Sequence, residues 1–438
     1  MRIAILGGGI GGLSLAWYLH HAQPGAHELT LFEQSLTPGG LVTGFQVEGY
    51  TFDRHYHCVL TTDHEVRRLV EALGLEHRLR FKQTRMGFYD GQRCIPFNNP
   101  FDLLRFPLLG PLDKLRLIFT ILYCQHAGDA ETLHRTPLEP WLRGLAGTRT
   151  FERVWTPLLC SKFDGNFDGI PATYIWSRMR RMQSTREKGG AVEKLGILHG
   201  GTTTLVKALA QRLPSLGVRL CLGASVSGLV ARGAQHGVIT PTGEEGPYDL
   251  VISTLPTPVH QRIASGAQAQ PRHAMPEKYL GIVDVILLLR RSLTPYYTLN
   301  LLDRRLPFTG IIETSHLMDL EDHGPYHVVY LPRYTDARGP IYAQSDEQLQ
   351  QHFCETLLHM FPDLSAEDIL QVYLFREPFV EPLTLCGGAY APFPESLGTE
   401  RRGVYLMNTG RLYPELHNCQ AVISLARRTA NHLLERHG

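Results

Sequence analysis

Five glycines occupy the six positions 7–12, directly after a short apolar run at residues 2–6. Glycine inside regular structure costs roughly 0.5–1 kcal/mol relative to alanine, so this density indicates a sharp turn or a close approach to a ligand. The apolar run is typical of a buried strand, and the residues after the glycines are typical of a helix. In such a unit Gly7 permits the turn, Gly9 admits a diphosphate and Gly12 lets the helix pack on the strand.

A second strand and an acid complete the pattern that dinucleotide binding requires. Residues 28–32 predict a strand that ends at Glu33, about 20 residues after the glycine loop. The Glu33 carboxylate can accept hydrogen bonds from ribose hydroxyls, and its charge disfavours the 2′-phosphate of NADP. The helix N-terminus adds free N–H groups and a partial positive charge that suit a diphosphate. Ile10, Gly11 and Gln34 adjoin these groups and are further candidate cofactor-binding residues.

The residues after Glu33 distinguish FAD from NAD, since a glycine pair, Gly39 and Gly40, gives a second close backbone approach to the diphosphate. The whole segment resembles the FAD-binding start of the flavin amine oxidase, protoporphyrinogen oxidase and phytoene desaturase superfamily. That group typically has arginine after the glycine pair, where this chain has Leu41. The resemblance implies FAD as cofactor and an α/β fold: a discontinuous, Rossmann-like FAD-binding domain (GR2-type) plus an α+β substrate domain with a helical insert.

Two internal segments extend the resemblance. Residues 52–57 resemble a family stretch that runs beside the flavin, which places His55, Tyr56 and His57 among the cofactor-binding residues. For both histidines a structural or solvating role is favoured over a role in catalysis. Val226 follows a glycine–helix–strand segment and corresponds to a valine that contacts adenine through its backbone in that family.

The C-terminal segment carries a further motif. Gly410 and Arg411 follow a strand-like run, and a final helix opens with Gln420, Ala421 and Val422. In the family the glycine turn meets the ribityl-phosphate part, and the helix N-terminus points at the flavin pyrimidine. The family usually has an acid where this chain has Arg411. Arginine at this place is similar to UDP-galactopyranose mutase, whose flavin is used without net redox change and whose arginine meets a sugar-nucleotide diphosphate.

The leading functional interpretation is an FAD-dependent oxidoreductase that dehydrogenates or desaturates an organic, apolar or membrane-derived small molecule. A flavin supplies the hard chemistry by accepting a hydride at N5. The substrate class stays open among amines, polyprenoids and porphyrin-like molecules, and no catalytic residue is assigned. The alternative is a mutase-like flavoenzyme acting on a sugar nucleotide, and a third reading is a protein that binds FAD only structurally. Tyr390 and Tyr413 are candidate substrate contacts, and Trp155, Lys162 and Phe163 are weaker ones.

The composition excludes several other classes. A formal net charge of +1 over 438 residues argues against nucleic acid as a partner. The eight cysteines show no CxxC spacing, so no zinc or other metal site is predicted. No signal peptide and no apolar run of about 18 residues is found, which predicts a cytoplasmic protein.

The motifs divide the chain into three parts. Residues 1–60, 190–265 and 395–438 are expected to form the FAD-binding domain. Residues 61–189 are expected to form a mainly helical part of the substrate domain, and residues 266–394 its mixed-sheet part.

Residues 101–122 are rich in leucine and phenylalanine with interspersed Arg105, Lys114 and Arg116. A basic amphipathic helix of this kind either packs on the protein's own core, which is the favoured interpretation, or lies in a membrane interface. The second interpretation would place the protein peripherally on the inner face of a membrane.

Overall fold

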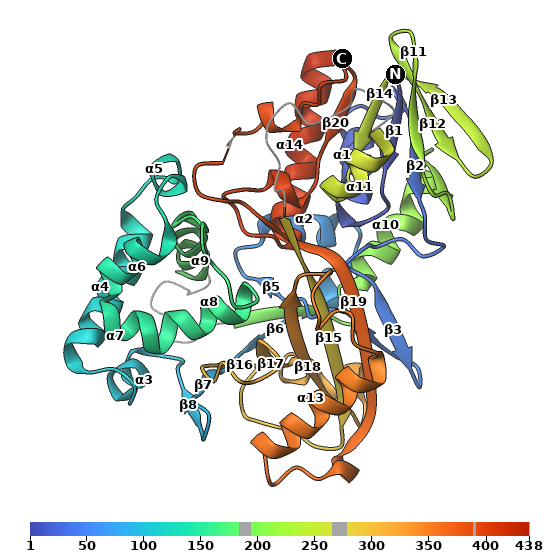
Figure 1. Cartoon of the computed structure of the whole chain (residues 1–438). Helices are drawn as coiled ribbons and strands as arrows, with labels where there is room; N and C mark the ends of the chain where they lie inside the picture. Colours follow the sequence, from blue (N-terminus) through green and yellow to red (C-terminus); the bar gives the residue numbers. More distant parts are fainter. Residues whose placement is uncertain (184–193, 265–277, 389–390, 438) are drawn as a thin grey trace.

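The computed structural model describes residues 1–183, 194–264, 278–388 and 391–437. A five-stranded parallel sheet organises its upper part (Figure 1). Its order is β10 (Arg219–Leu222), β2 (Glu28–Glu33), β1 (Arg2–Leu6), β14 (Leu250–Ser253) and β20 (Val404–Leu406). Because all five strands run in one direction, their carboxyl ends meet at one edge. The expected α/β fold with a parallel sheet is confirmed.

Successive residues of β1 point to opposite faces of this sheet, and both faces are covered. Ile3 and Ile5 pack with the apolar residues of α1 (Ile10–Ala22), α10 (Thr203–Ser215) and α14 (Cys419–His437). Ala4 and Leu6 lie on the other face, under a small antiparallel sheet and one helix. These covering elements are β11 (Gly228–Arg232), β12 (Gln235–Thr240), β13 (Gly243–Tyr248) and α11 (Thr257–Ala264).

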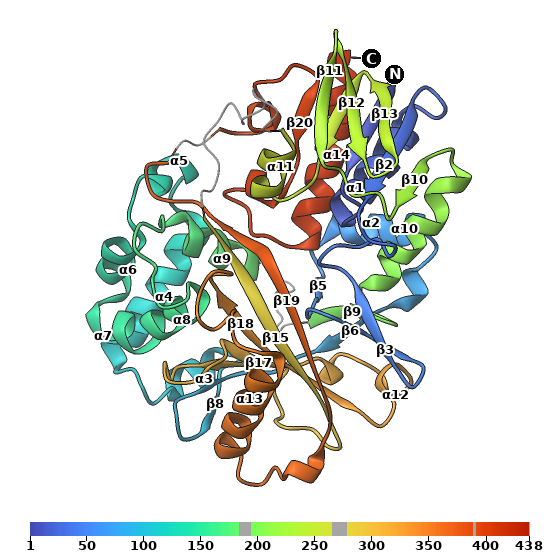
Figure 2. The ribbon, with the colours of Figure 1, turned by 45° about the vertical axis from the view of Figure 1, so that its right-hand side comes forward.

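A seven-stranded mixed sheet forms the lower part of the molecule (Figure 2). Its order is β19 (Ile369–Leu383), β15 (Lys278–Leu289), β18 (His327–Thr335), β17 (Gly310–Glu313), β16 (Thr298–Leu301), β7 (Met86–Tyr89) and β8 (Cys94–Pro96). The apolar face of α13 (Asp346–Met360) packs on one side of this sheet. The other side faces the hairpin of β3 (Gly44–Val47) and β4 (Tyr50–Asp53). It also faces a sheet of β5 (Val59–Leu60), β9 (Lys194–Leu198) and β6 (Leu79–Gln83).

Helices dominate the first inserted segment, as expected, but the segment also contributes strands. β7 pairs with β16, and β8 pairs with β7, so this part of the chain completes a sheet built mainly from residues after 278. These strands have only four and three residues, which is too short for a period-two pattern to stand out in the sequence. The helices are α2 (His64–Ala72), α3 (Pro100–Arg105), α4 (Pro111–His126), α5 (Ala130–His134), α6 (Leu138–Ala146), α7 (Thr148–Thr150), α8 (Thr156–Lys162) and α9 (Thr173–Gln183), with α12 (Leu320–His323) lying later in the chain.

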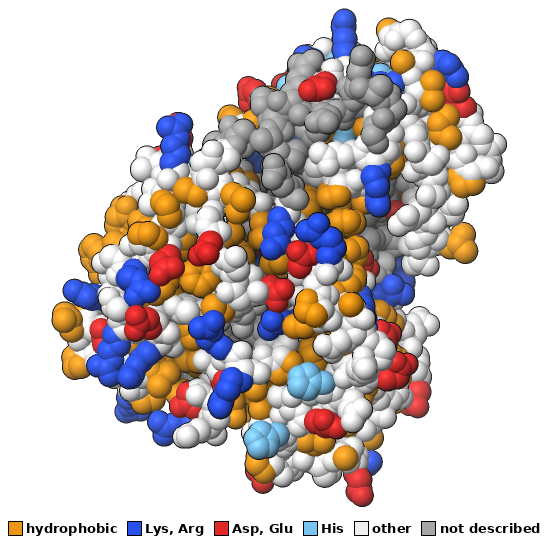
Figure 3. Space-filling view, in the orientation of Figure 1, with side chains coloured by type: hydrophobic (Ala, Val, Ile, Leu, Met, Phe, Trp, Pro, Cys, Tyr) orange, Lys and Arg blue, Asp and Glu red, His pale blue; other side chains and the backbone are white. Residues whose placement is uncertain are grey.

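Helices α3 to α9 enclose their own apolar core. On the outer surface of this helical part, at the left of Figure 3, apolar side chains are interspersed with basic ones.

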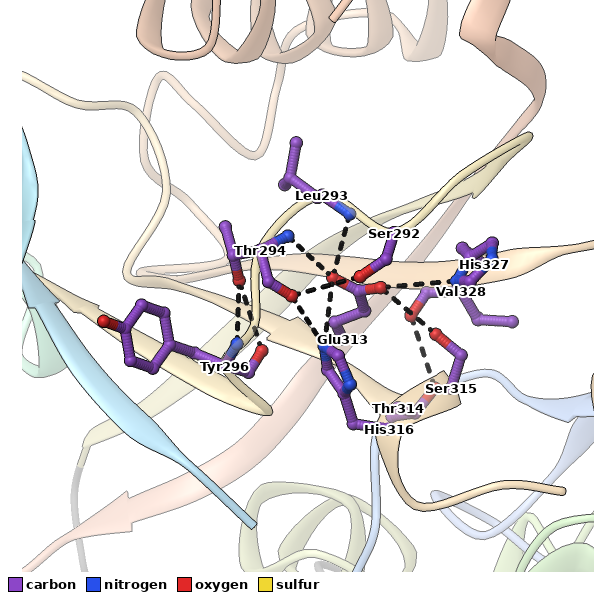
Figure 4. Close-up of polar contacts among 10 residues, drawn as sticks. All are labelled: Ser292, Leu293, Thr294, Tyr296, Glu313, Thr314, Ser315, His316, His327 and Val328. Atoms are coloured by element: carbon purple, nitrogen blue, oxygen red, sulfur yellow. Dashed lines mark hydrogen bonds and ion pairs between the residues drawn. The ribbon is translucent and has the colours of Figure 1, made fainter. Parts of the chain in front are cut away.

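Glu313, a fully buried carboxylate at the end of β17, organises the loop before β16 (Figure 4). It accepts hydrogen bonds from the backbone N–H groups of Leu293 (3.1 Å) and Thr294 (3.2 Å), and lies 3.5 Å from ring nitrogens of His316 and His327. Burial alone would raise its pKa, but the bonds from the two histidines and a serine outweigh it and lower the pKa to about 2. The same contacts raise the pKa of His316 against the opposing effect of burial.

Replacing Glu313 by glutamine is expected to destabilise the fold by about 2 kcal/mol, since charge-assisted hydrogen bonds are lost in a buried place. The Glu313 contribution is complete above about pH 4.5 and is lost as the pH falls toward the folded pKa of about 2. The contribution of His316, whose folded pKa is raised, is present below about pH 6.5 and is lost at higher pH. Thermal unfolding should therefore show the largest difference between wild type and Glu313→Gln between these limits, and a smaller one in stronger acid. The exposed Glu400 offers a control, Glu400→Gln, that should melt as wild type. A difference that is independent of pH would contradict this account.

Candidate functional site

The glycine loop lies at the carboxyl edge of the parallel sheet, between β1 and α1. Gly7 has a φ of +107°, and a Cβ on it would lie 2.5 Å from the Thr254 hydroxyl oxygen. A Cβ on Gly12 would lie 2.0 Å from the carbonyl oxygen of Gly7. Both positions therefore exclude any side chain for reasons internal to the fold.

Gly9 differs from its neighbours because it borders open space. The nearest atom to a Cβ built there is the carbonyl oxygen of Gly39, 3.9 Å away. The second glycine pair lies alongside, since the N–H of Gly39 donates to the carbonyl of Gly8 (2.8 Å), and Gly40 approaches Gly9. The two glycine segments thus form a cradle next to the N-terminus of α1, as a diphosphate requires. Ile10 is buried, whereas Leu41 is half-buried beyond the second pair.

Glu33 ends β2 beside this cradle. One of its carboxylate oxygens accepts the N–H of Gly8 (2.7 Å), and the other accepts the N–H of Ser35 (2.8 Å). The carboxylate is thereby fixed with lone pairs to spare for ribose hydroxyls. The N–H of Ala224 donates to the carbonyl of Glu33 (2.9 Å), which brings the segment that leads to Val226 to the same place. Gln34 points into solvent from an exposed position.

Arg411 lies past β20, at the same edge, in a short 3-10 turn. The residue is 7% exposed, and its Nε and Nη2 atoms have no hydrogen-bond partner among the described residues. Burial lowers its pKa to about 10. A buried cation without a counter-charge is costly, and this arrangement is typical of a site that an anion completes.

The surroundings of Arg411 are also polar. His260 is fully buried with neither ring nitrogen bonded in the described structure, and burial, with the charge of Arg411, lowers its pKa to about 4. The side-chain amide of Asn408 donates to the Leu255 carbonyl (2.8 Å), while its oxygen stays unbonded within the described part. Gly410 precedes this group and lies in the same turn as Arg411.

Helix α14 begins at Cys419, as the sequence predicts within one residue, and its N-terminus is tied to α2 and α1. The Gln420 side chain accepts the N–H groups of Glu65 (2.9 Å) and Val66 (3.2 Å) at the start of α2. Asn418 caps α14 by accepting the N–H of Ala421 (3.0 Å), and Val422 packs on Gly11 of α1. The side chains of Gln420 and Val422 therefore fix the helix, and its free N–H groups remain for a ligand.

The segment 55–57 lies between the two sheets. His55 Nδ1 is 3.3 Å from a carboxylate oxygen of Asp284, whose pKa is raised by burial although the histidine opposes this. Burial also lowers the pKa of His57, 3.9 Å from Asp53. Asp53 accepts the N–H groups at the start of α10, so these two histidines adjoin structural carboxylates. This arrangement is compatible with the structural role that the sequence favoured.

A polar cluster next to Tyr56 was not predicted as a unit. Lys162 Nζ lies 3.0 Å from Glu381 and 3.6 Å from the centre of the Tyr334 ring. The second oxygen of Glu381 lies 3.3 Å from His417. Only 16% of the Lys162 side chain and 12% of the Glu381 side chain is exposed.

The electrostatics of this cluster keep its groups in one protonation state. Burial would raise the pKa of Glu381, but Lys162 and His417 outweigh it and hold the pKa well below its usual range. Burial raises the pKa values of the Tyr56 and Tyr334 hydroxyls. The carboxylate thus stays charged and the two phenols stay protonated.

Helix α9 supplies the solvent-facing side of the cluster. Tyr174 is half-buried and Arg178 is exposed, and the charge of Arg178 acts on the tyrosines and on Glu381. The cluster therefore opens to solvent past Arg178. His417 is two residues before α14 and Tyr56 lies in the segment 55–57, so its other side adjoins the expected cofactor site.

Of the weaker sequence candidates, only Lys162 joins this cluster. Trp155 and Phe163 lie in the core of the helical part. The hydroxyl of Tyr413 is hydrogen-bonded to His134 (2.9 Å) and Thr173, which ties the C-terminal loop to the helical part. Tyr390 lies outside the described residues. Glu381 and His417 carried no sequence signal, because Glu381 is 219 positions from its partner Lys162.

A family model of flavin containing amine oxidoreductases matches residues 10–404. The chain belongs to this family. FAD is accordingly its cofactor, and the cradle at Gly9 with the fixed carboxylate of Glu33 fits that group. The members of this family are FAD-dependent oxidoreductases.

Individual relatives of this flavin containing amine oxidoreductase are distant in sequence. Coproporphyrinogen III oxidase of Staphylococcus aureus is 22% identical over 287 residues, which cover 58% of this chain and 60% of that protein's length. The structure of reduced UDP-galactopyranose mutase has a TM-score of 0.74 at 17% identity, over 99% of this chain and 96% of that one. Wild-type putrescine oxidase bound to putrescine has a TM-score of 0.71 at 14% identity, over the whole of both chains. The two structural likenesses show a shared fold.

Proposed function

We propose that this flavoenzyme dehydrogenates an organic substrate that is rich in hydrogen-bond acceptors, such as carboxylates. FAD, when bound, supplies the chemistry by accepting a hydride at N5. The proposal includes the discontinuous FAD-binding unit of residues 1–60, 190–265 and 395–438, with the substrate held by the parts inserted between them. Glu33 would bind the ribose, the Gly9 cradle and Arg411 the diphosphate region, and the N-terminus of α14 the flavin ring.

The observation that carries the proposal is the cluster of Lys162, Glu381, His417, Tyr56 and Tyr334. A nearly buried ion pair adds little to stability, because desolvation offsets the Coulombic attraction. Perturbed ionisable groups that adjoin an opening are typical of functional sites. The structural cost of this cluster is therefore best explained by substrate binding.

The donors of the cluster indicate the substrate class. The tyrosine hydroxyls stay protonated, and Lys162 and Arg178 are positively charged, so the site offers N–H and O–H donors. Such a site attracts carboxylate or carbonyl oxygens and repels a cationic amine. A porphyrinogen with acidic side chains, as suggested by the name of the coproporphyrinogen III oxidase relative, is the first substrate to test.

The alternative is a mutase-like enzyme acting on a sugar nucleotide without net redox change. Arg411 favours it, because a planar guanidinium with two unbonded N–H positions suits a diphosphate. The fold shared with UDP-galactopyranose mutase is compatible with this alternative.

Anaerobic mixing of the FAD-loaded enzyme with single donors would test the proposal. We expect coproporphyrinogen to bleach the flavin absorption band and putrescine to leave it unchanged. Tyr334→Phe removes one donor without changing the shape of the site and should slow bleaching by about tenfold, equivalent to one neutral hydrogen bond. Tyr123→Phe, outside the cluster, should bleach as wild type.

Two results would reject the proposal. Bleaching by putrescine alone would indicate an amine oxidase. Interconversion of UDP-galactopyranose and UDP-galactofuranose by the reduced enzyme, without bleaching by any donor, would favour the mutase alternative.

A further inference from the structure

The outer surface of α3 and α4 carries a concentration of exposed apolar side chains. Six large hydrophobic residues of this helix pair are between 48% and 71% exposed: Phe101, Leu104, Leu112, Leu115, Phe119 and Leu122. They are six of the ten large hydrophobic residues that stand out as exposed in the described part of the chain. With side chains of about 150–200 Å² each, they form a patch on the order of 500 Å², the upper range for a monomer surface.

The orientation of α4 is the opposite of what packing on its own core would produce. The helix buries Leu117, Thr120 and Cys124. It exposes Leu112, Leu115, Phe119 and Leu122, which are spaced by three or four residues and therefore share one face. A helix that presents its larger apolar stripe outward needs an apolar partner there.

Basic side chains accompany this stripe. Arg105 and Arg116 are exposed, and Lys114 joins the two helices by donating to the carbonyl of Leu104 (2.6 Å). The two acidic residues of the pair are used locally: Asp102 accepts the N–H of Asn98 (2.7 Å), and Asp113 accepts the N–H of Gly110 (3.2 Å).

The neighbouring turns add two more exposed arginines, Arg149 and Arg153, and the latter donates to the carbonyl of Leu108 (3.2 Å). Since the whole chain has a net charge of only +1, this concentration of basic side chains is local.

We propose that α3 and α4 dock the enzyme on a lipid bilayer with anionic headgroups. The leucine and phenylalanine side chains would enter the boundary between headgroups and acyl chains, while the lysine and arginines would contact lipid phosphates. A symmetric contact between two copies of the chain is less suitable, because it would bring the same basic groups together. Among the described residues no helix is long and apolar enough to cross a membrane, so the docking is peripheral.

The position of α4 connects this surface with the polar cluster. Helix α4 packs on α9, which carries Tyr174 and Arg178 at the open side of the cluster. Bilayer docking would therefore bring the opening of the site near the lipid, which suits an apolar or membrane-derived substrate. Only this consequence rests on the proposed function, because lipid binding is measured without any substrate.

Vesicle flotation of the FAD-loaded enzyme tests the docking. We expect binding to vesicles of phosphatidylcholine with about one third phosphatidylglycerol, weaker binding to phosphatidylcholine alone, and a decrease with rising salt. Leu115→Gln with Phe119→Gln should weaken binding at least about tenfold, since two side chains no longer enter the acyl boundary. Lys114→Gln with Arg116→Gln should weaken binding to the anionic vesicles only. All four positions lie on the helix surface, and thermal unfolding would verify the fold.

A matched control uses two other exposed leucines, Leu36 (81% exposed) and Leu320 (74% exposed), which lie away from α3 and α4. Leu36→Gln with Leu320→Gln should bind vesicles as wild type. The docking is overturned if wild type does not float with either vesicle, or if this control loses as much binding as the α4 variant. It is also overturned if the α4 variant changes only the sedimenting mass of the protein, which would indicate a protein–protein surface. None of these outcomes alters flavin bleaching in a lipid-free assay, so the proposed reaction stays separately testable.

Discussion

Replacing Arg411 by methionine should have opposite effects on FAD binding and on the stability of the FAD-free protein. We expect the dissociation constant of FAD to rise about 100-fold, because removing one partner of a buried charge pair costs about 2–5 kcal/mol. We expect the melting temperature of the FAD-free protein to rise by roughly 2–4 °C, since an apolar side chain replaces an uncompensated buried charge. A residue with a purely structural role would lower the melting temperature instead.

The physical reason is the state of the guanidinium. Arg411 is 93% buried, two of its nitrogens are unbonded in the described structure, and burial lowers its pKa to about 10. In the FAD-free protein this charge is a cost, and an anion at the carboxyl edge of the sheet converts it into binding energy. The turn that carries Arg411 follows β20, and β20 runs parallel to the strands that end at the glycine loop and at Glu33.

Calorimetric titration of FAD into the FAD-free protein and thermal unfolding measure the two effects. Arg411→Lys keeps the charge without the planar fork and should be intermediate in affinity. Arg428→Met is the matched control, because Arg428 is paired with Glu415 (3.3 Å) on the surface of α14, and it should leave FAD binding unchanged. An Arg411→Met protein that binds FAD within threefold of wild type would assign the charge to a substrate anion and favour the sugar-nucleotide alternative.

Replacing Gly9 by valine should abolish FAD binding while the fold remains intact. A valine side chain would occupy the cradle beside Gly39, where a Cβ meets no atom closer than 3.9 Å. Gly9 also has a φ of −71°, which any residue adopts, so no backbone strain is introduced. The loss of close contact with the diphosphate should reduce affinity by more than about 100-fold.

Gly12→Ala provides the contrast, since its Cβ would lie 2.0 Å from the Gly7 carbonyl oxygen and must displace backbone. We expect this variant to lower the melting temperature. Gly144→Ala is the neutral control, because a Cβ there meets nothing within 4 Å inside α6. FAD content after denaturation and the melting temperature of each FAD-free variant separate the two roles. Retention of FAD by Gly9→Val would place the diphosphate elsewhere.

The interpretation of the first 33 residues depends on local patterns, and the structure agrees with it. The strand, the glycine turn, the helix and the second strand each have a characteristic period or composition, and they follow one another directly in the chain. The same is true of α13, whose predicted bounds, Asp346–Met360, are those observed, because Ser345 and Gln348 form a capping box at its start. The assignment of Glu33 and the glycines to FAD contacts stays a prediction, which the variants above address.

Other features were decided by contacts between distant parts of the chain. β7 and β8 belong to a sheet formed mostly by residues more than 180 positions later, and their short sequences show no strand period of their own. The outward orientation of the apolar stripe of α4 also depends on which neighbours it meets, because its sequence is apolar on more than one side.

The sequence by itself determined the parallel α/β unit, its glycine loop and the cofactor class, because those features are encoded within short contiguous segments. Only the tertiary structure brought Lys162, Glu381 and His417 together and left Arg411 buried without a counter-charge. The reason is physical: hydrophobic periodicity specifies which residues are buried, but not which distant residues share a site. That choice is made by the packing of the helical part and the mixed sheet against the C-terminal loop.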